Sequence, residues 1–182
     1  KMPIKIHDNL PARKLLQNEV VDVIDSSTAE KQDIRPLKFL LLNLMPKKLE
    51  TEVQFARLLG ASPLQIELTL MTTETYSPRN TKKEHLIEFY KTLDDINNNF
   101  YDVLIITGAP IETVPFQEVK YWNELKEIIS WSSKNVFRRI GVCWGAQALL
   151  KVLHNVEKHS MEKKLFGVFD HNLNQEKQYR LM

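Results

Sequence analysis

The feature that most constrains the fold is an alternation of apolar runs and helix-like segments that begins at Leu37. The runs are short enough for strands and cover Leu37–Leu44, Leu64–Met71, Tyr101–Thr107 and Val136–Val142. Helix-forming segments follow them at Leu49–Leu59, Thr81–Leu93, Val119–Ser133 and Ala146–Leu153. This β-α order predicts an α/β sandwich with a mainly parallel sheet, because a strand reaches a parallel neighbour through a crossover helix.

Local signals set some boundaries of these segments. Gly60 is expected to end the first helix, and Thr81 is expected to cap the second, with Glu84 completing a capping box. The apolar composition of Val136–Val142 is typical of a buried strand.

Residues 1–36 are predicted to form an N-terminal arm, and residues 37–182 the α/β domain. Within the arm we expect a short edge strand at Met2–Ile6, a helical turn or two after Pro11, and another strand at Val20–Ile24.

A second constraint is the junction between the last apolar run and the last helix, which holds Cys143, the only cysteine. Gly141 and Gly145 lie two residues to either side, the build of a nucleophile elbow: a sharp strand-to-helix turn where a Cβ would clash. Such a turn aims the thiol at a helix N-terminus, whose unpaired N–H groups favour thiolate and hold an oxyanion. These N–H groups include the backbone of Trp144. A buried structural cysteine is the alternative, but the paired glycines favour a nucleophile.

Composition excludes several classes of function. The net charge is +2, from 25 basic and 23 acidic residues, so no charge field points to nucleic acid or a membrane surface. One cysteine allows no internal disulfide, which fits a cytoplasmic protein. We expect neither a membrane span nor a signal peptide. Metal-ligand spacing and nucleotide-binding glycine motifs are absent, so no metal and no bound cofactor is expected.

Three turns are expected at the carboxyl ends of the strands, where α/β sheets bind ligands: Met45–Lys48, Gly108–Glu112 and Cys143–Gly145. Lys47 and Lys48 stand at a helix start, against the dipole preference. They are either solvated lysines or cations that hold an anionic group or polarise a carbonyl at the mouth of the site.

A thiol nucleophile needs a base, and no histidine has a convincing context. His154 lies eleven residues after Cys143, roughly 16 Å along a helix, and is out of reach. His85 falls inside another helix, where a satisfied or surface role is expected. His159 and His171 stay open.

The elbow Gly141–Gln147 resembles the Gly-x-Cys-x-Gly-x-Gln motif of class I glutamine amidotransferases, which implies that flavodoxin-like fold. A closer resemblance, over nearly the whole chain to about His171, is to the homoserine O-succinyltransferase/O-acetyltransferase family (homoserine transsuccinylases). The segments that carry it are Met2–Ile4, Asp8–Ala12, Ile34–Lys38, Asn43–Glu52, Ser62–Gln65, Arg79–Thr81, Glu84–Leu86, Thr107–Pro110, Tyr121–Trp122 and Cys143–Ala148.

The resemblance implies an acyltransferase that moves an acetyl group from acetyl-CoA, a co-substrate, to the hydroxyl of L-homoserine in methionine biosynthesis. Cys143 matches the nucleophile that carries the acyl group as a thioester in a ping-pong reaction. Glu112 matches the donor-selecting position, where glutamate goes with acetyl-CoA and glycine with succinyl-CoA. Lys164 matches a lysine that binds the amino-acid substrate, and Lys47 and Lys48 match a basic pair.

The family's catalytic His and Glu belong to a C-terminal portion of roughly a hundred residues, expected beyond residue 182. We therefore expect a domain that lacks this portion, and a homodimer. Four alternatives stay open: succinyl-CoA as donor, L-serine as acceptor, a glutaminase-type hydrolase of the same fold, and a non-catalytic fragment.

Overall fold

The computed structural model describes residues 4–19, 21–25, 35–75, 81–163 and 165–170. Its strands are β1 (Ile4–Lys5), β2 (Val23–Ile24), β3 (Leu37–Leu42), β4 (Ile66–Met71), β5 (Tyr90–Lys91), β6 (Tyr101–Ile106) and β7 (Val136–Gly141). Its helices are α1 (Ala12–Asn18), α3 (Lys48–Gly60), α4 (Lys83–Phe89), α5 (Leu93–Ile96), α6 (Trp122–Asn135) and α7 (Trp144–His154), with a 3₁₀ turn, η1, at Phe116–Glu118.

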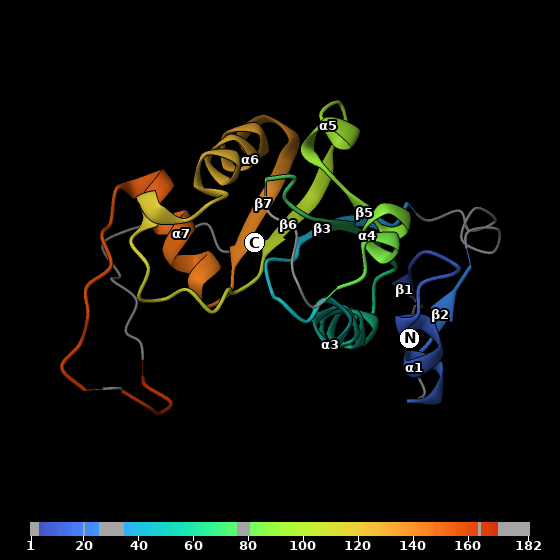
Figure 1. The fold of residues 1–182 in the computed structure, drawn as a ribbon. Helices are drawn as coiled ribbons and strands as arrows, with labels where there is room; N and C mark the ends of the chain where they lie inside the picture. Colours follow the sequence, from blue (N-terminus) through green and yellow to red (C-terminus); the bar gives the residue numbers. More distant parts are fainter. Residues whose placement is uncertain (1–3, 20, 26–34, 76–80, 164, 171–182) are drawn as a thin grey trace, which may run out of the picture.

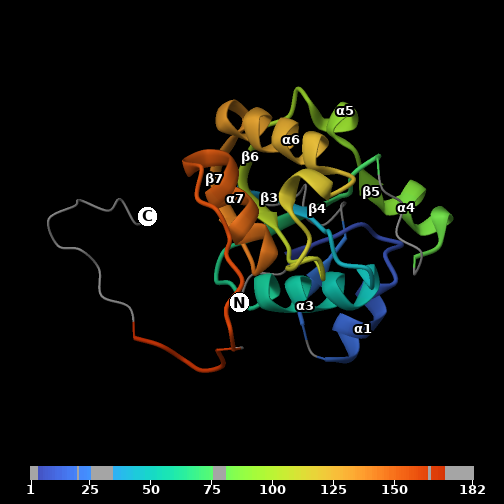
Figure 2. The ribbon, with the colours of Figure 1, turned by 60° about the vertical axis from the view of Figure 1, so that its left-hand side comes forward.

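The strands form one sheet in the order β2-β1-β4-β3-β6-β7, and every pairing within the described residues is parallel. The predicted α/β sandwich is therefore confirmed. Strand β3 pairs with β4 over its whole length and with β6 on its other side, which places β3 inside the sheet. Helices cover both faces, with α1 and α3 on one side and α6 and α7 on the other (Figures 1 and 2).

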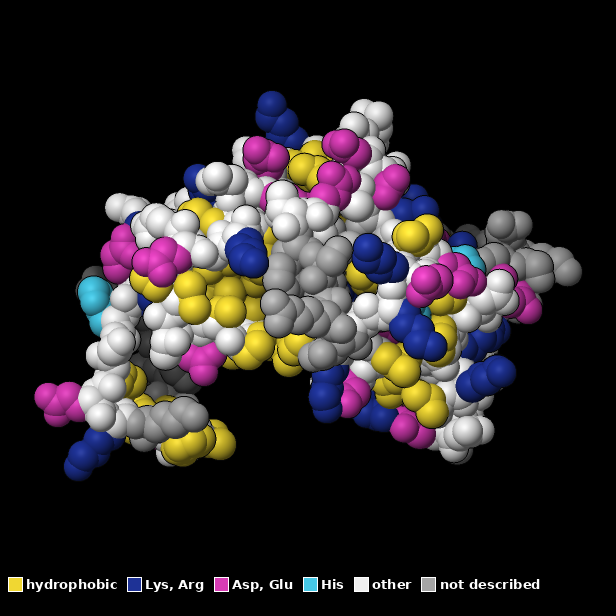
Figure 3. Space-filling model, viewed as in Figure 1, with side chains coloured by type: hydrophobic (Ala, Val, Ile, Leu, Met, Phe, Trp, Pro, Cys, Tyr) yellow, Lys and Arg dark blue, Asp and Glu magenta, His cyan; other side chains and the backbone are white. Residues whose placement is uncertain are grey.

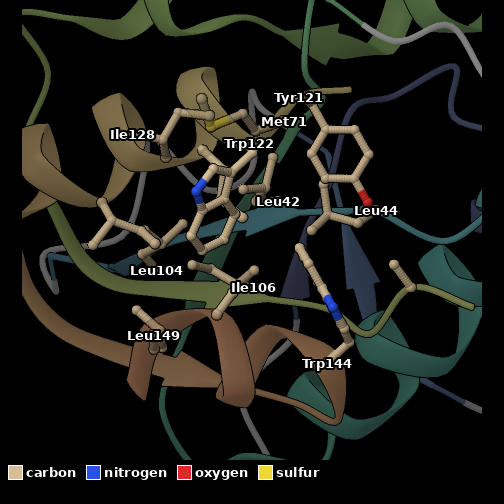
Figure 4. Packing of buried hydrophobic residues seen from close by; sticks show 14 of the residues in the cluster. Leu42, Leu44, Met71, Leu104, Ile106, Tyr121, Trp122, Ile128, Trp144 and Leu149 are labelled. Carbon is tan, nitrogen blue, oxygen red and sulfur yellow. The ribbon is translucent and has the colours of Figure 1, made fainter. Parts of the chain in front are cut away.

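Two hydrophobic cores fill these layers. The larger lies between the sheet and α6 and α7, and Figure 4 shows Trp122 and Trp144 in it, packed around Ile106 from β6. The smaller lies against α1 and α3 and includes Ile4, Leu16 and Ile66. Burying aromatic and branched side chains on both faces is what a central parallel sheet requires.

The strands and the helix expected near the N-terminus are present. The expected edge strand differs, because β1 lies between β2 and β4 and Ile4 is fully buried. The described residues before 25 thus pair into the same sheet as the rest; the domain division at residue 36 stays a prediction.

The helix expected from Thr81 to Leu93 was wrong in both of its ends. The structure begins α4 at Lys83, and the Thr81 hydroxyl donates to the Pro46 carbonyl at 3.4 Å instead of capping the helix. The helix ends at Phe89 because Tyr90 turns inward and pairs with β4 as β5. A new helix, α5, then starts with a capping box between Thr92 and Asp95.

The expectation of a buried last strand was also wrong. Among the described residues β7 pairs only with β6, and Phe137 on it is 65% exposed. Its apolar side chains are therefore exposed at this edge of the sheet, and Ile140 and Val142 are exposed there as well.

Candidate active site

Three loops meet at the carboxyl ends of β3, β6 and β7, as expected for an α/β sheet. The first two are joined by the Leu44 amide, which donates to the Thr107 hydroxyl at 2.8 Å, and by the Thr107 amide, which donates to the Leu42 carbonyl at 3.1 Å. The third is joined by the Val142 amide, which donates to the Ile106 carbonyl at 2.9 Å.

Cys143 occupies the turn between β7 and α7 with an exposed thiol. Its backbone has φ 54° and ψ −121°, a conformation that costs a residue with a Cβ about 1–3 kcal/mol and persists only where the surroundings enforce it. The residue is the N-cap of α7, and its carbonyl accepts from the Ala146 amide at 3.0 Å. The strained strand-to-helix turn expected from the sequence is therefore present.

The two flanking glycines explain how the turn closes. A Cβ on Gly145 would stand 2.4 Å from the Ile106 carbonyl oxygen, and a Cβ on Gly141 would stand 2.5 Å from the Ala146 Cα. Both are far inside van der Waals contact with backbone, which cannot move aside cheaply. The glycines let the start of α7 lie directly on the end of β6.

Gly108 lies against Cys143. A Cβ at Gly108 would be 3.1 Å from the Cβ of Cys143 and 3.4 Å from its Sγ. The structure thus places the thiol beside the first residue of the predicted turn Gly108–Glu112. Trp144, at the first position of α7, has no intrahelical acceptor for its amide, which makes that N–H a candidate oxyanion donor.

The side chain of Trp144 belongs to the core. It is fully buried against Phe116, Tyr121 and Trp122, and its indole nitrogen has no partner among the described residues. This packing anchors the residue after the nucleophile.

The two lysines of the first loop differ in their surroundings. Lys47 is exposed and pairs with Glu50 at 3.0 Å, the solvated alternative. Lys48 is only 4% exposed, donates to the Asn43 carbonyl, and places its ammonium 5.5 Å from the centre of the Tyr90 ring. Burial lowers the pKa of Lys48 to about 8, although nearby Glu52 raises it.

A buried polar network surrounds Lys48, and it was not among the predictions from the sequence. The Tyr90 hydroxyl donates to Glu52 at 2.6 Å and accepts from the Asn43 amide at 2.9 Å. His85 contacts the same Glu52 oxygen at 2.8 Å, so the expected satisfied histidine is confirmed. The signal available was the spacing of Lys48 and Glu52, four residues apart on one helix face. The network holds the loop that begins at Asn43.

Glu112 is exposed on the loop after β6. It lines a hollow of about 690 Å³, within the size range of ligand pockets, together with Gln147 of α7 and residues of the segment after α7. In Figure 3 that segment stands clear of the body on the left of the view. The hollow therefore connects the predicted donor-selecting residue with the first turn of α7.

Other predicted residues fall elsewhere. Lys164 and His171 lie outside the described residues. His154 ends α7, which keeps it away from the elbow, and His159 lines the hollow with Glu112. Within the residues that the structure describes, no group of three or more His, Cys, Asp or Glu is arranged to hold a metal ion. In the same part of the chain no helix has both the length and the apolar character to cross a membrane.

Comparison with known proteins identifies the family of the chain. The sequence model of the family described as homoserine O-succinyltransferase matches residues 3–182. Proteins named homoserine O-acetyltransferase from Bacillus subtilis (strain 168), Shouchella clausii and Clostridium acetobutylicum are 53%, 52% and 52% identical to this chain. Each match covers 94% of this chain, but only 57%, 56% and 57% of the relative. The chain spans little more than half the length of these relatives. From the extent of the family match and this identity, the chain belongs to the homoserine O-succinyltransferase family.

Proposed function

We propose that the chain takes part in homoserine O-acetylation, with Cys143 as the acyl carrier. The observation that carries this is the strained turn at Cys143, which holds the thiol at the N-terminus of α7 and against Gly108. The names of the similar proteins supply the reaction class, acetyl transfer to homoserine.

The proposed chemistry has two steps. The Cys143 thiolate attacks the thioester carbonyl of acetyl-CoA, the carbon–sulfur bond to CoA breaks, and CoA leaves as a thiolate that takes up a proton. The homoserine hydroxyl then attacks the carbonyl carbon of the Cys143 thioester and gives its proton to a base, the bond from that carbon to Sγ breaks, and Cys143 leaves as a thiolate. The Trp144 amide and the backbone at Gly108 are the candidates to stabilise the oxyanion of each step.

The base of the second step is proposed to be the family's histidine, supported by its glutamate, in the part of the relatives beyond the matched region. Lys164 is proposed to bind the homoserine carboxylate. Lys47 and Lys48 line a hollow of about 420 Å³ with Lys82 and His85. We assign this cationic hollow to the mouth of the site. The homodimer and the cytoplasmic location stay predictions.

Glu112 is proposed to select the donor. A carboxylate in the hollow repels the distal carboxylate of a succinyl group and occupies its space, while an acetyl group has neither charge nor length to conflict. L-serine stays the alternative acceptor, because a difference of one methylene is worth only about 1–3 kcal/mol in selectivity.

The test of acyl transfer is intact-protein mass spectrometry after mixing with acetyl-CoA. Two forms are compared: the 182-residue chain, and the same chain joined to the C-terminal part of the Bacillus subtilis relative. An acetyl adduct on Cys143 that disappears when homoserine is added supports transfer, and Cys143→Ser is the control for the site of the adduct. Failure of both forms to acquire the adduct would overturn the proposal. Glutamine hydrolysis in the absence of acyl-CoA would favour the hydrolase alternative instead.

Donor choice is tested in the joined form by the ratio of kcat/KM for acetyl-CoA to that for succinyl-CoA. Glu112→Gly should lower this ratio by removing the charge and the bulk. Glu112→Gln keeps the bulk and removes only the charge, so it separates the two causes. If Glu112→Gly leaves the ratio unchanged, the proposed role of Glu112 is wrong.

A further inference from the structure

Lys158 binds the loop that carries Glu112 from a segment 46 residues further along the chain. Its ammonium donates to the Glu112 carbonyl at 2.7 Å and to the Val114 carbonyl at 2.6 Å, and it contacts the Ile111 carbonyl at 3.5 Å. An ammonium has three N–H donors, and here all of them face one loop. The same nitrogen lies 4.8 Å from the centre of the buried Phe116 ring, a cation–π distance.

The residues at the end of α7 turn the chain so that Lys158 reaches this loop. Asn155 adopts the left-handed conformation with φ 53°, and the Val156 amide then donates back to the Leu150 carbonyl at 3.2 Å. This end cap turns the chain out of the helix axis. Lys158 follows three residues later and reaches the loop after β6.

Besides Lys158, the loop is held by the packing of Ile111 and Val114 against the larger core and by two backbone hydrogen bonds of its own. Its own backbone bonds are the Ile111 amide to the Ala109 carbonyl at 2.8 Å and the Val114 amide to the Ile111 carbonyl at 3.1 Å. Glu112 and Thr113 between them are exposed. Burial lowers the pKa of Lys158, and the charge of Glu112 acts in the opposite direction, so the ammonium and the carboxylate are close enough to interact.

We propose that Lys158 is a positioning residue for donor selection: by binding three carbonyls of residues 111–114 it fixes where the Glu112 carboxylate stands in the hollow. The proposal rests on the donor-selecting role of Glu112. It assigns to Lys158 no contact with the substrate. Its effect on donor choice is therefore exerted only through Glu112.

The test is the acetyl-CoA to succinyl-CoA ratio of kcat/KM in the joined form of the chain. Lys158→Met keeps a long side chain over Phe116 and removes the donors, so the loop loses its clamp and Glu112 leaves its blocking position. The ratio should fall by about fivefold or more, as is usual for residues in direct contact. Loss of the positive charge alone would raise the ratio, because an ammonium attracts the carboxylate of succinyl-CoA and so favours that donor. A rise in the ratio would therefore overturn the proposal.

Matched variants separate positioning from general damage. Lys158→Arg keeps the charge and the donors and should retain most of the discrimination, whereas Lys126→Met removes an exposed lysine of α6 and should leave the ratio unchanged. In the Glu112→Gly background, Lys158→Met should no longer lower the ratio. An equal effect with and without Glu112 would show that Lys158 acts independently. If Glu112→Gly leaves the ratio unchanged, the donor-selecting role of Glu112 is wrong. If Glu112→Gly changes the ratio but Lys158→Met does not, the positioning role of Lys158 is wrong.

A readout that needs no turnover completes the test. The Ile111 and Val114 amides should exchange with deuterium faster in Lys158→Met than in the parent, because their hydrogen bonds belong to the clamped loop. Exchange in the centre of α6 should stay the same, which shows that the fold is intact. Unchanged exchange at Ile111 and Val114 would overturn the proposal whether or not the protein turns over.

Discussion

At the scale of single residues, the site depends on side chains in unfavourable surroundings. Cys143 has a strained backbone, and Lys48 has an ammonium buried with Glu52 as its nearby opposite charge. Glu52 is itself fully buried, and one of its carboxylate oxygens has no partner among the described residues. Such groups persist only where the fold outweighs their cost, and they cluster at functional sites.

Lys48 gives the chain a pH dependence of stability in the alkaline range. The folded pKa of about 8 is lower than the ordinary lysine pKa of 10.5 that applies to an unfolded chain. Between these values the unfolded state binds more protons, so the free energy of unfolding rises with pH. Below the folded pKa both states are protonated and the full penalty, on the order of 3 kcal/mol, is present.

We predict that Lys48→Met removes this rise. The measurement is urea unfolding from about pH 7.5 to about pH 9.5, below the ordinary tyrosine pKa of about 10. That upper limit matters because burial, followed by Glu52, raises the pKa of Tyr90, which lowers stability at higher pH. Lys47→Met is the matched control, since Lys47 is exposed and should keep the slope of the parent. An equal slope in Lys48→Met and the parent would contradict the prediction.

At the scale of elements, the elbow depends on how closely α7 approaches β6. The approach is possible because Gly145 has no Cβ, and the neighbouring atoms are the carbonyl oxygens of Ile106 and Thr107. A helix that starts on the end of a strand in this way fixes its first N–H groups relative to the sheet. Positions of the thiol and of the candidate oxyanion donor follow from that contact.

Gly145→Ala is predicted to destabilise the fold by about 1–3 kcal/mol, the usual cost of forcing extra atoms into a packed contact. Gly60→Ala is the matched control: it adds the same methyl group at the end of α3, where the nearest atom is a methyl of the Val21 side chain at 2.7 Å, and side chains yield more easily than backbone. The comparison is made by urea unfolding. A loss for Gly145→Ala no larger than that for Gly60→Ala would refute the close-packing argument.

At the scale of the whole molecule, apolar side chains are exposed around the β7 edge of the sheet. β7 at its edge leaves Phe137 and Ile140 exposed, and α7 leaves Leu150 and Leu153 exposed next to it. The matched region is only 56–57% of the length of the similar proteins. We expect their C-terminal part to cover this apolar face.

Joining that part to the chain should therefore reduce the binding of a fluorescent apolar dye, measured by its emission. Phe137→Lys should be nearly neutral in the 182-residue chain, because the ring is in water, and should cost more than about 1 kcal/mol in the joined form. Lys134→Ala, on the neighbouring α6, is the control and should behave alike in both forms. A joined form that binds as much dye as the 182-residue chain would disprove the covering.

Much of the architecture could be predicted from the sequence because it depends on local patterns. Apolar runs of strand length between helix-forming segments require a parallel sheet, and Gly141 and Gly145 around Cys143 require a tight turn. The predictions failed where a partner far away in sequence determined the local structure or the exposure of a residue. Tyr90 leaves its helix because its hydroxyl donates to Glu52 and accepts from the Asn43 amide, both far away in sequence. Phe137 is exposed because only one neighbouring strand is present in the described chain.

By itself the sequence determined the fold class and the elbow, which follow from residue types and their spacing, and it predicted Cys143 as the nucleophile. Only the tertiary structure decided that Lys48 is buried while Lys47 is in water, that Gly108 lies against the thiol, and that Lys158 binds the loop of Glu112. Each of these depends on contacts between segments far apart in the chain. A pattern of residues along the chain carries no record of such contacts, because they arise only when the sheet brings its loops to one edge.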